Sequence, residues 1–211
     1  FVPGKEDKNP FKASTADLVI LQDKDPNFRV LNLTVSPLQD ASTSWFHKSL
    51  GGYHGAKMRR YQELYDHHIE NEIRDLIGTF QKRPVPEALD STLATLAIIN
   101  MLNTRYIIYS TDAPPIVNKS ELGNAWFVSK IKSVADADEE IAAAGEFNPA
   151  DEAIIDVRYS NLMDGLSPEP DSTAKISLSE YRPNYLKYVS SSAREQLAVF
   201  SEIYYDKGWQ A

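Results

Sequence analysis

The residues best suited to bind a ligand gather around a Gly-Gly turn, in the run from His47 to Arg60. The turn leads into a predicted helix, and a helix N-terminus favours anions because its free N–H groups and its dipole are positive. Lys57 and Arg60 fall on the first turns of that helix, where they could contact a phosphate or a carboxylate. We therefore consider a pocket for a phosphorylated or acidic group, such as a lipid-phosphate sugar. The candidate ligand-binding residues are His47, Lys48, Tyr53, His54, Lys57, Arg59 and Arg60, with Trp209 as an exposed aromatic candidate near the end of the chain.

The same run has a simpler interpretation, in which aromatic packing supports the loop and the basic side chains are solvated. The glycines at 51, 52 and 55 do not match the spacing of a phosphate-binding loop, which favours this second interpretation.

Other residue patterns do not predict catalysis or a metal site. His67 and His68 are adjacent, so on a helix they point about 100° apart and cannot easily share a metal ion. The acidic group at 136–140 could be taken for a pair of glycosidase carboxylates, but its position at a helix start is explained by capping and by the helix dipole. No serine lies in a G-x-S-x-G elbow. We predict no catalytic residue, no metal and no cofactor.

Composition excludes several classes of protein. The 211 residues carry 22 Lys and Arg against 30 Asp and Glu, a net charge of −8, which makes a nucleic-acid partner unexpected. There is no cysteine, so disulfide frameworks, zinc ribbons and thiol catalysis are excluded. No apolar run approaches the roughly 20 residues that span a bilayer. The most apolar run, 93–102, is interrupted by Thr95 and Asn100, and we interpret it as a buried helix.

Hydrophobic periodicity predicts an α+β fold, a mixed sheet with strand–helix–strand units followed by a β-rich, sandwich-like C-terminal part. The segment 16–21 fits either a short helix or a strand. We expect helices over 56–77, ended by Gly78, over 86–102, and from Asp136 or Asp138 to 144. We expect strands over 28–35, 105–110, 125–134, 152–159, 174–181, 185–191 and 195–205.

Turn residues predict where the chain divides. Gly165, Pro168 and Pro170 mark a linker over 161–173, between an α+β domain at 1–160 and a β-rich segment at 174–211. The chain starts at Phe1 without a signal peptide, and Asp206-Lys207-Gly208 resembles a hairpin turn that no returning strand follows. We therefore expect a piece of a longer polypeptide that continues past residue 211.

Several stretches together resemble one family. They are FRVLNL (28–33), SWFHKSLGGYHGAKMRRYQ (44–62), NMLNTRYII (100–108), GNAWFV (123–128), EYRPNYLKY (180–188) and VFSEIYYDKGW (199–209). In this order they resemble the C-terminal extracytoplasmic region of the bacterial YfhO-like membrane proteins, over residues 16–211.

The resemblance implies a polytopic membrane protein of the type-C glycosyltransferase kind, which modifies cell-envelope glycans. This chain would be its accessory domain on the extracytoplasmic face of the bacterial cytoplasmic membrane. The domain itself would be non-catalytic, with the membrane-embedded helices of the parent chain, and a glycan or lipid-phosphate sugar, as its partners. No catalytic residue is carried over, and the 47–60 run is carried over only as a recurring motif. The alternative is a stand-alone glycan-binding or scaffold module with no enzyme in the same chain.

Overall fold

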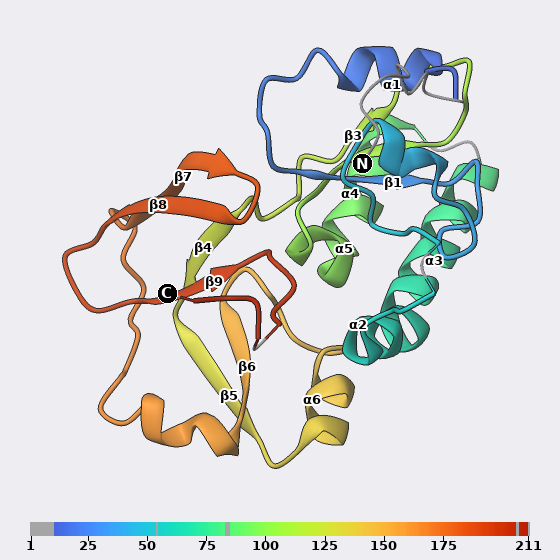
Figure 1. Cartoon of the computed structure of the whole chain (residues 1–211). Helices are drawn as coiled ribbons and strands as arrows, with labels where there is room; N and C mark the ends of the chain where they lie inside the picture. Colours follow the sequence, from blue (N-terminus) through green and yellow to red (C-terminus); the bar gives the residue numbers. More distant parts are fainter. Residues whose placement is uncertain (1–10, 54, 83–84, 206, 211) are drawn as a thin grey trace, which may run out of the picture. The chain divides into compact units, whose positions relative to one another are not determined.

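The α+β class is confirmed by the computed structural model, which describes residues 11–53, 55–82, 85–205 and 207–210 (Figure 1). Within these ranges the strands form several small sheets, none of which closes into a barrel. The chain folds into two compact units. Unit 1 comprises residues 1–55 and 105–117, and unit 2 comprises residues 56–104 and 118–211. This division differs from the predicted one, because no unit boundary lies at 161–173.

Unit 1 is built on a small sheet with the strand order β1-β2-β3. β1 is Arg29–Asn32, β2 is Thr104–Ile108 and β3 is Ile116–Val117. Helix α1 (Thr15–Ile20) and the 3-10 turn η1 (Ser42–Trp45) accompany the sheet. The apolar core joins Ala16 and Ile20 of α1 to Val30 and Ile108 of the sheet.

Local polar contacts set the limits of the first two elements of unit 1. Ser14 and Asp17 form a reciprocal capping box, which explains why 16–21 becomes a helix rather than a strand. β1 ends at Asn32, short of the predicted 28–35, because the Asn32 Oδ1 accepts hydrogen bonds from the backbone N–H and the hydroxyl of Thr34. Such a side-chain turn competes with the strand ladder.

The first helical part of unit 2 is α2 (Arg59–Leu64), the π-helical turn η2 (Tyr65–Ile69) and α3 (Glu70–Gln81). The predicted end at Gly78 is wrong, because the helix continues to Gln81. Its last turn is held by the Thr79 hydroxyl, which lies 3.3 Å from the Thr92 hydroxyl of the next helix. Gly78 is not among the described residues with positive φ.

The predicted helix 86–102 is broken into α4 (Pro86–Thr95) and α5 (Ala97–Met101) at Leu96, which leaves the helical region at ψ 75°. The break is stabilised from another helix. The Glu72 carboxylate of α3 accepts the backbone N–H groups of Ile98 and Ile99, each at 2.9 Å. An acidic group thereby caps the start of α5, which has no cap of its own.

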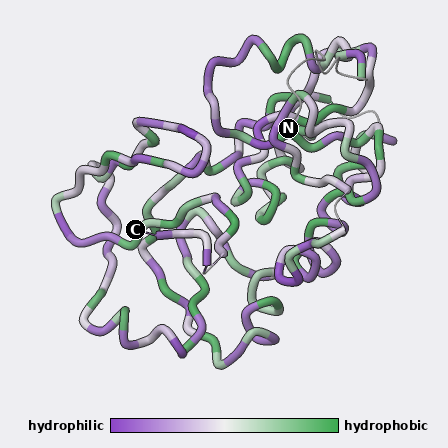
Figure 2. The backbone as a smooth tube through the Cα atoms, in the orientation of Figure 1, coloured by the Kyte–Doolittle hydropathy of each residue, from purple (hydrophilic) through white to green (hydrophobic). Residues whose placement is uncertain are grey.

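The predicted strand 125–134 is two strands, because its halves have different partners. β4 (Ala125–Val128) pairs antiparallel with β9 (Leu197–Phe200), whereas β5 (Lys130–Val134) pairs parallel with β6 (Glu152–Asp156). Helix α6 (Ala137–Ala143) connects β5 to β6, so the expected strand–helix–strand unit is present. Figure 2 colours the apolar stretches of β6 and β9 in green.

The C-terminal part of unit 2 is rich in β-structure, as predicted. β6 stops at Asp156, because this side chain caps the 3-10 helix η3 (Val157–Leu162) in place of the predicted strand end. β7 (Lys175–Arg182) and β8 (Tyr185–Ser191) form a hairpin whose turn contains Asn184 at φ 64°. β9 is shorter than the predicted 195–205, and its pairing with β4 joins the C-terminal segment to residues before the predicted linker.

Candidate functional site

The predicted ligand-binding residues fall into both units. His47, Lys48 and Tyr53 belong to unit 1, and Lys57, Arg59, Arg60 and Trp209 belong to unit 2. His54 lies outside the described residues. The boundary between the units falls at 55–56, inside the run that the sequence presents as one candidate site.

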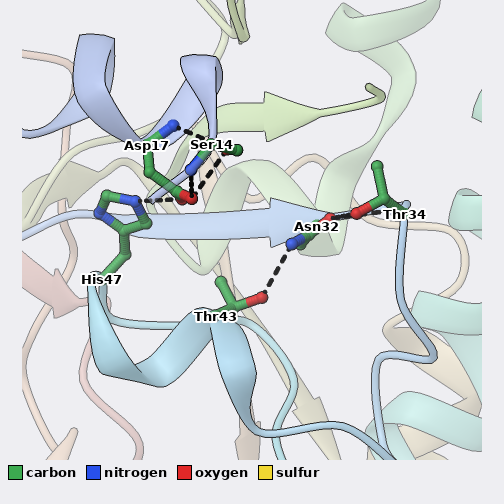
Figure 3. A network of polar contacts seen from close by, with 6 residues as sticks. All are labelled: Ser14, Asp17, Asn32, Thr34, Thr43 and His47. Atoms are coloured by element: carbon green, nitrogen blue, oxygen red, sulfur yellow. Dashed lines mark hydrogen bonds and ion pairs between the residues drawn. The ribbon is translucent and has the colours of Figure 1, made fainter. Parts of the chain in front are cut away.

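His47 belongs to a buried polar network in unit 1 (Figure 3). Its Nε2 lies 2.9 Å from the Asp17 Oδ1, and only 3% of its side chain is exposed. Burial lowers the pKa of His47, and the neighbouring Asp17 opposes this shift only in part. The neutral imidazole therefore connects helix α1 to the loop that precedes Ser49. Ser49 forms an isolated β-bridge with Val30 of β1.

The order of groups in this network does not suit nucleophilic catalysis. The Ser14 hydroxyl donates to the Asp17 Oδ2 at 2.7 Å, so the carboxylate lies between the serine and His47. In a catalytic triad the histidine lies between the serine and the carboxylate and takes the serine proton. The other three residues in Figure 3, Asn32, Thr34 and Thr43, are structural, since the Asn32 side-chain amide donates to the Thr43 hydroxyl at 3.0 Å and holds η1 against β1.

The other predicted cations are used locally or are solvated. The Lys48 ammonium donates to the side-chain oxygen of Asn27, a buried residue. In unit 2 the Arg59 Nε donates to Glu63 at 2.7 Å, one turn along the same helix, and 91% of the Arg59 side chain is exposed. Lys57 and Tyr53 are exposed. The exposure of Lys57 and Arg59 agrees with the simpler interpretation of the run, whereas Lys48 is half-buried.

Arg60 and Trp209, however, both line a cavity of about 780 Å³ in unit 2. Its walls come from α2, α5, α6, β4, β6, β9 and the segment after β9. Most of the lining is apolar, with Leu64, Ile141 and Phe147 from the helical side. We take this cavity as the candidate functional site.

Charged side chains at the cavity are mostly acidic. Among the described residues, four carboxylates line it, against the single guanidinium of Arg60; they belong to Glu63, Glu140, Glu152 and Glu202. Arg60 also acts on a carboxylate that is not part of the cavity lining. Its positive charge contributes, after the larger effect of Arg158, to lowering the pKa of Asp156. The electrostatics therefore favour a neutral or basic ligand over the anion considered from the sequence.

Aromatic side chains give the cavity ring faces for stacking. The Trp126 indole N–H donates to the Pro149 carbonyl at 2.7 Å, and the Trp209 N–H donates to the Ile203 carbonyl at 3.0 Å. Because both N–H groups are used within the protein, the rings offer apolar contact. Trp209 is 41% exposed, in agreement with the prediction that it is accessible.

One histidine and one glycine hold the helical wall of the cavity in place. His68, in the π-helical turn η2, contacts the Ile141 carbonyl of α6 through its Nε2 at 2.6 Å. Gly145 makes room for this contact, since a Cβ there would lie 3.1 Å from the His68 ring. His67 is exposed, so the adjacent pair shares no pocket.

Sequence reasoning missed most of the cavity wall. Trp126 stood out only as part of a family-like motif. From the sequence, Glu140 and its acidic neighbours are expected to cap a helix, which is correct for Asp136, whose side chain accepts the N–H groups of Asp138 and Glu139. The helical spacing of Arg60, Glu63 and Leu64 was the available signal that one face of α2 carries both charged and apolar lining.

No protein-family model, no curated protein and no solved structure matches the chain. In the described part of the chain, no helix has both the length and the apolar character needed to cross a membrane. Nor, among those same residues, do three or more His, Asp or Glu side chains lie in position to hold a metal ion. What the protein does must therefore be inferred from the geometry of the cavity and from the sequence resemblance.

Proposed function

We propose that this protein is a non-catalytic recognition domain, an accessory part of a YfhO-like polytopic membrane glycosyltransferase. In this proposal it lies on the extracytoplasmic face of the bacterial cytoplasmic membrane and takes part in modifying cell-envelope glycans. The membrane-embedded helices of the parent chain carry the catalysis. The ordered series of family-like stretches over 16–211 supports the placement.

The cavity of unit 2 is the observation that carries the recognition role. Its volume of about 780 Å³ falls in the range typical of ligand sites, roughly 300–1,000 Å³. Its composition is also typical, because apolar and aromatic walls surround a few charged groups. A domain that only filled space between other parts would have no need of such a site.

A glycan or a lipid-phosphate sugar is the ligand class that the resemblance suggests. Trp126 and Trp209 could stack on sugar rings, and the carboxylates could accept hydrogen bonds from hydroxyl groups. A phosphate would find one cation at the cavity, Arg60. The aromatic pair also supports the second candidate function, a stand-alone glycan-binding or scaffold module with no enzyme in the same chain.

The two candidates differ in the parent polypeptide. Sequencing the complete reading frame and mapping its topology with reporter fusions separates them. Several membrane spans before Phe1 support the accessory domain. A secretion signal as the only preceding segment would rule it out in favour of the stand-alone module.

The recognition role is tested by filling the cavity in the full-length protein. Ala144 lines the cavity at the end of α6, whereas Ala142 is exposed on the same helix. We expect Ala144→Leu to reduce transfer of labelled sugar to the cell envelope severalfold, and Ala142→Leu to leave it unchanged. Equal transfer by both variants and the wild type, at equal protein levels, would contradict the proposal.

A further inference from the structure

The cavity of unit 2 lies along the edges of two strands. Consecutive side chains of a strand point to opposite faces, so a cavity over one face touches every second residue. Here the lining includes residues 152–155 of β6 and residues 197–200 of β9, four in a row from each strand. Contact with every residue of a stretch indicates that the cavity reaches the side of the strand, where both sets of side chains and the backbone meet.

Neither edge is covered by a further strand within the described ranges, although the Glu152 N–H at the start of β6 already donates to the Asn148 carbonyl at 2.9 Å. Among the described residues, β6 pairs with β5 alone and β9 pairs with β4 alone, so the opposite edge of each strand has no strand partner. All eight lining residues are at most half-buried, and their side chains are mainly apolar. An exposed apolar edge of this kind is a template for pairing with another extended chain.

The side chains of the cavity favour a peptide over a sugar. The lining holds no Asn, Gln, Ser, Thr or His within the described residues. Those neutral groups ordinarily hydrogen-bond ligand hydroxyls, and without them a sugar would depend on the carboxylates, the Arg60 guanidinium and the Tyr204 hydroxyl. An extended peptide instead satisfies its hydrogen bonds with the backbone and places its side chains against the apolar walls.

Charge indicates the composition of that peptide. The carboxylates of Glu140, Glu152 and Glu202 are half-buried at the cavity, where screening by salt is weaker than at the surface. The whole chain carries a net charge of −8, which disfavours insertion of a segment from a second copy. Both observations point to a basic partner.

We propose that an extended segment of another protein, rich in β-branched and basic residues, binds in this cavity by adding a strand to the free edges of β6 and β9. The inference rests on the proposed recognition role and names its partner. The segment's backbone pairs with the strand edges, its apolar side chains contact Ile154, Val199 and their neighbours, and its lysines or arginines face the carboxylates.

Fluorescence anisotropy with three labelled octapeptides tests the inference on the chain as it is. The first alternates Lys and Val, the second alternates Glu and Val, and the third is the Lys-Val peptide with alternate backbone nitrogens methylated. We expect binding of the first, and binding of the third that is weaker by about tenfold or more, because two or three backbone hydrogen bonds are lost. We expect the acidic peptide not to bind.

Matched variants locate the binding site. The double substitution Glu140→Gln with Glu152→Gln should lower the affinity for the Lys-Val peptide by about threefold to tenfold. The control Glu87→Gln with Glu146→Gln changes the net charge equally at two exposed positions outside the cavity and should leave the affinity unchanged. Circular dichroism of each variant verifies that it is folded.

The outcomes distinguish this inference from the proposed function. Equal affinity for the methylated and unmethylated peptides, or for the basic and acidic peptides, would overturn strand addition by a basic segment. Binding of neutral oligosaccharides in a Trp209-dependent manner, with no peptide bound, would overturn the peptide and retain the recognition role. If no peptide, oligosaccharide or lipid-phosphate analogue binds, and Ala144→Leu is also silent in cells, both proposals fail.

Discussion

The imidazole of His47 is almost fully buried and contacts the Asp17 carboxylate. From the sequence, His47 is the first member of a basic, glycine-containing run that suggests an anion pocket. In the structure its polar contact joins two parts of the unit 1 core instead. A buried histidine with one good partner is explained by stability, without a ligand.

Because burial lowers the pKa of His47 below its usual 6.5, the unfolded state takes up a proton more readily than the folded state. Stability is therefore lost as the pH falls through 6.5 toward the folded pKa. We expect the melting temperature of unit 1 to fall between pH 7.5 and pH 5. His47→Gln can keep a hydrogen bond to Asp17 without titrating, so its melting temperature should depend less on pH.

Differential scanning calorimetry across that pH range makes the measurement. His67→Gln is the control, because His67 is exposed, and it should retain the wild-type slope. An unchanged slope in His47→Gln would show that other groups cause the pH dependence.

The glycines of the same run have a steric role. A Cβ on Gly51 would lie 1.9 Å from the Pro37 carbonyl oxygen, which is backbone and cannot rotate away, whereas a Cβ on Gly55 meets no atom within 4 Å. Gly51→Ala should lower the free energy of unfolding by about 3 kcal/mol or more. Gly55→Ala should change it by less than about 0.5 kcal/mol. Urea denaturation compares the two, and equal stability would contradict this close approach of the two backbone segments.

At the scale of elements, Glu72 shows how a helix boundary can depend on a distant side chain. Its carboxylate caps α5 from α3, and burial raises its pKa in spite of the hydrogen bonds from Ile98 and Ile99. Glu72→Ala leaves those two N–H groups without this acceptor and should destabilise unit 2 by about 2 kcal/mol. Glu70→Ala, at an exposed position on the same helix, is the control and should have little effect. Urea unfolding followed by circular dichroism distinguishes them, and similar midpoints would refute the capping role.

A comparison of the predicted elements with the observed ones shows which features of the fold a sequence pattern can predict. Periodicity and capping residues predicted the strand–helix–strand unit around α6, the two strands β7 and β8 and the helical nature of 59–81, because these depend on neighbours in the chain. The break at Leu96 and the split at Ser129 depend on partners that come from far along the chain, Glu72 and β9. The candidate site also depends on partners that are distant in the chain. Arg60 and Trp209 were named, but the acidic and aromatic wall around them is assembled by tertiary folding.

At the scale of the whole molecule, the chain passes between its two compact units at 55–56, 104–105 and 117–118. Each unit has its own buried apolar residues, such as Val30 in unit 1 and Leu76 in unit 2. We expect two calorimetric transitions. Gly51→Ala should lower only one of them and Glu72→Ala only the other. A single transition that both variants lower equally would show that the units unfold together.

The discontinuity of unit 1 also affects how the protein folds during synthesis. The segment that ends at residue 55 must wait for residues 105–117 before β1 can pair with β2. At about 5–20 residues per second, the wait for the intervening chain is roughly 3 to 10 s. During that time the apolar side chains of β1, Val30 and Leu31, lack the neighbouring strand that covers them in the folded state. The segment around β1 is therefore a natural substrate for chaperones that protect nascent chains.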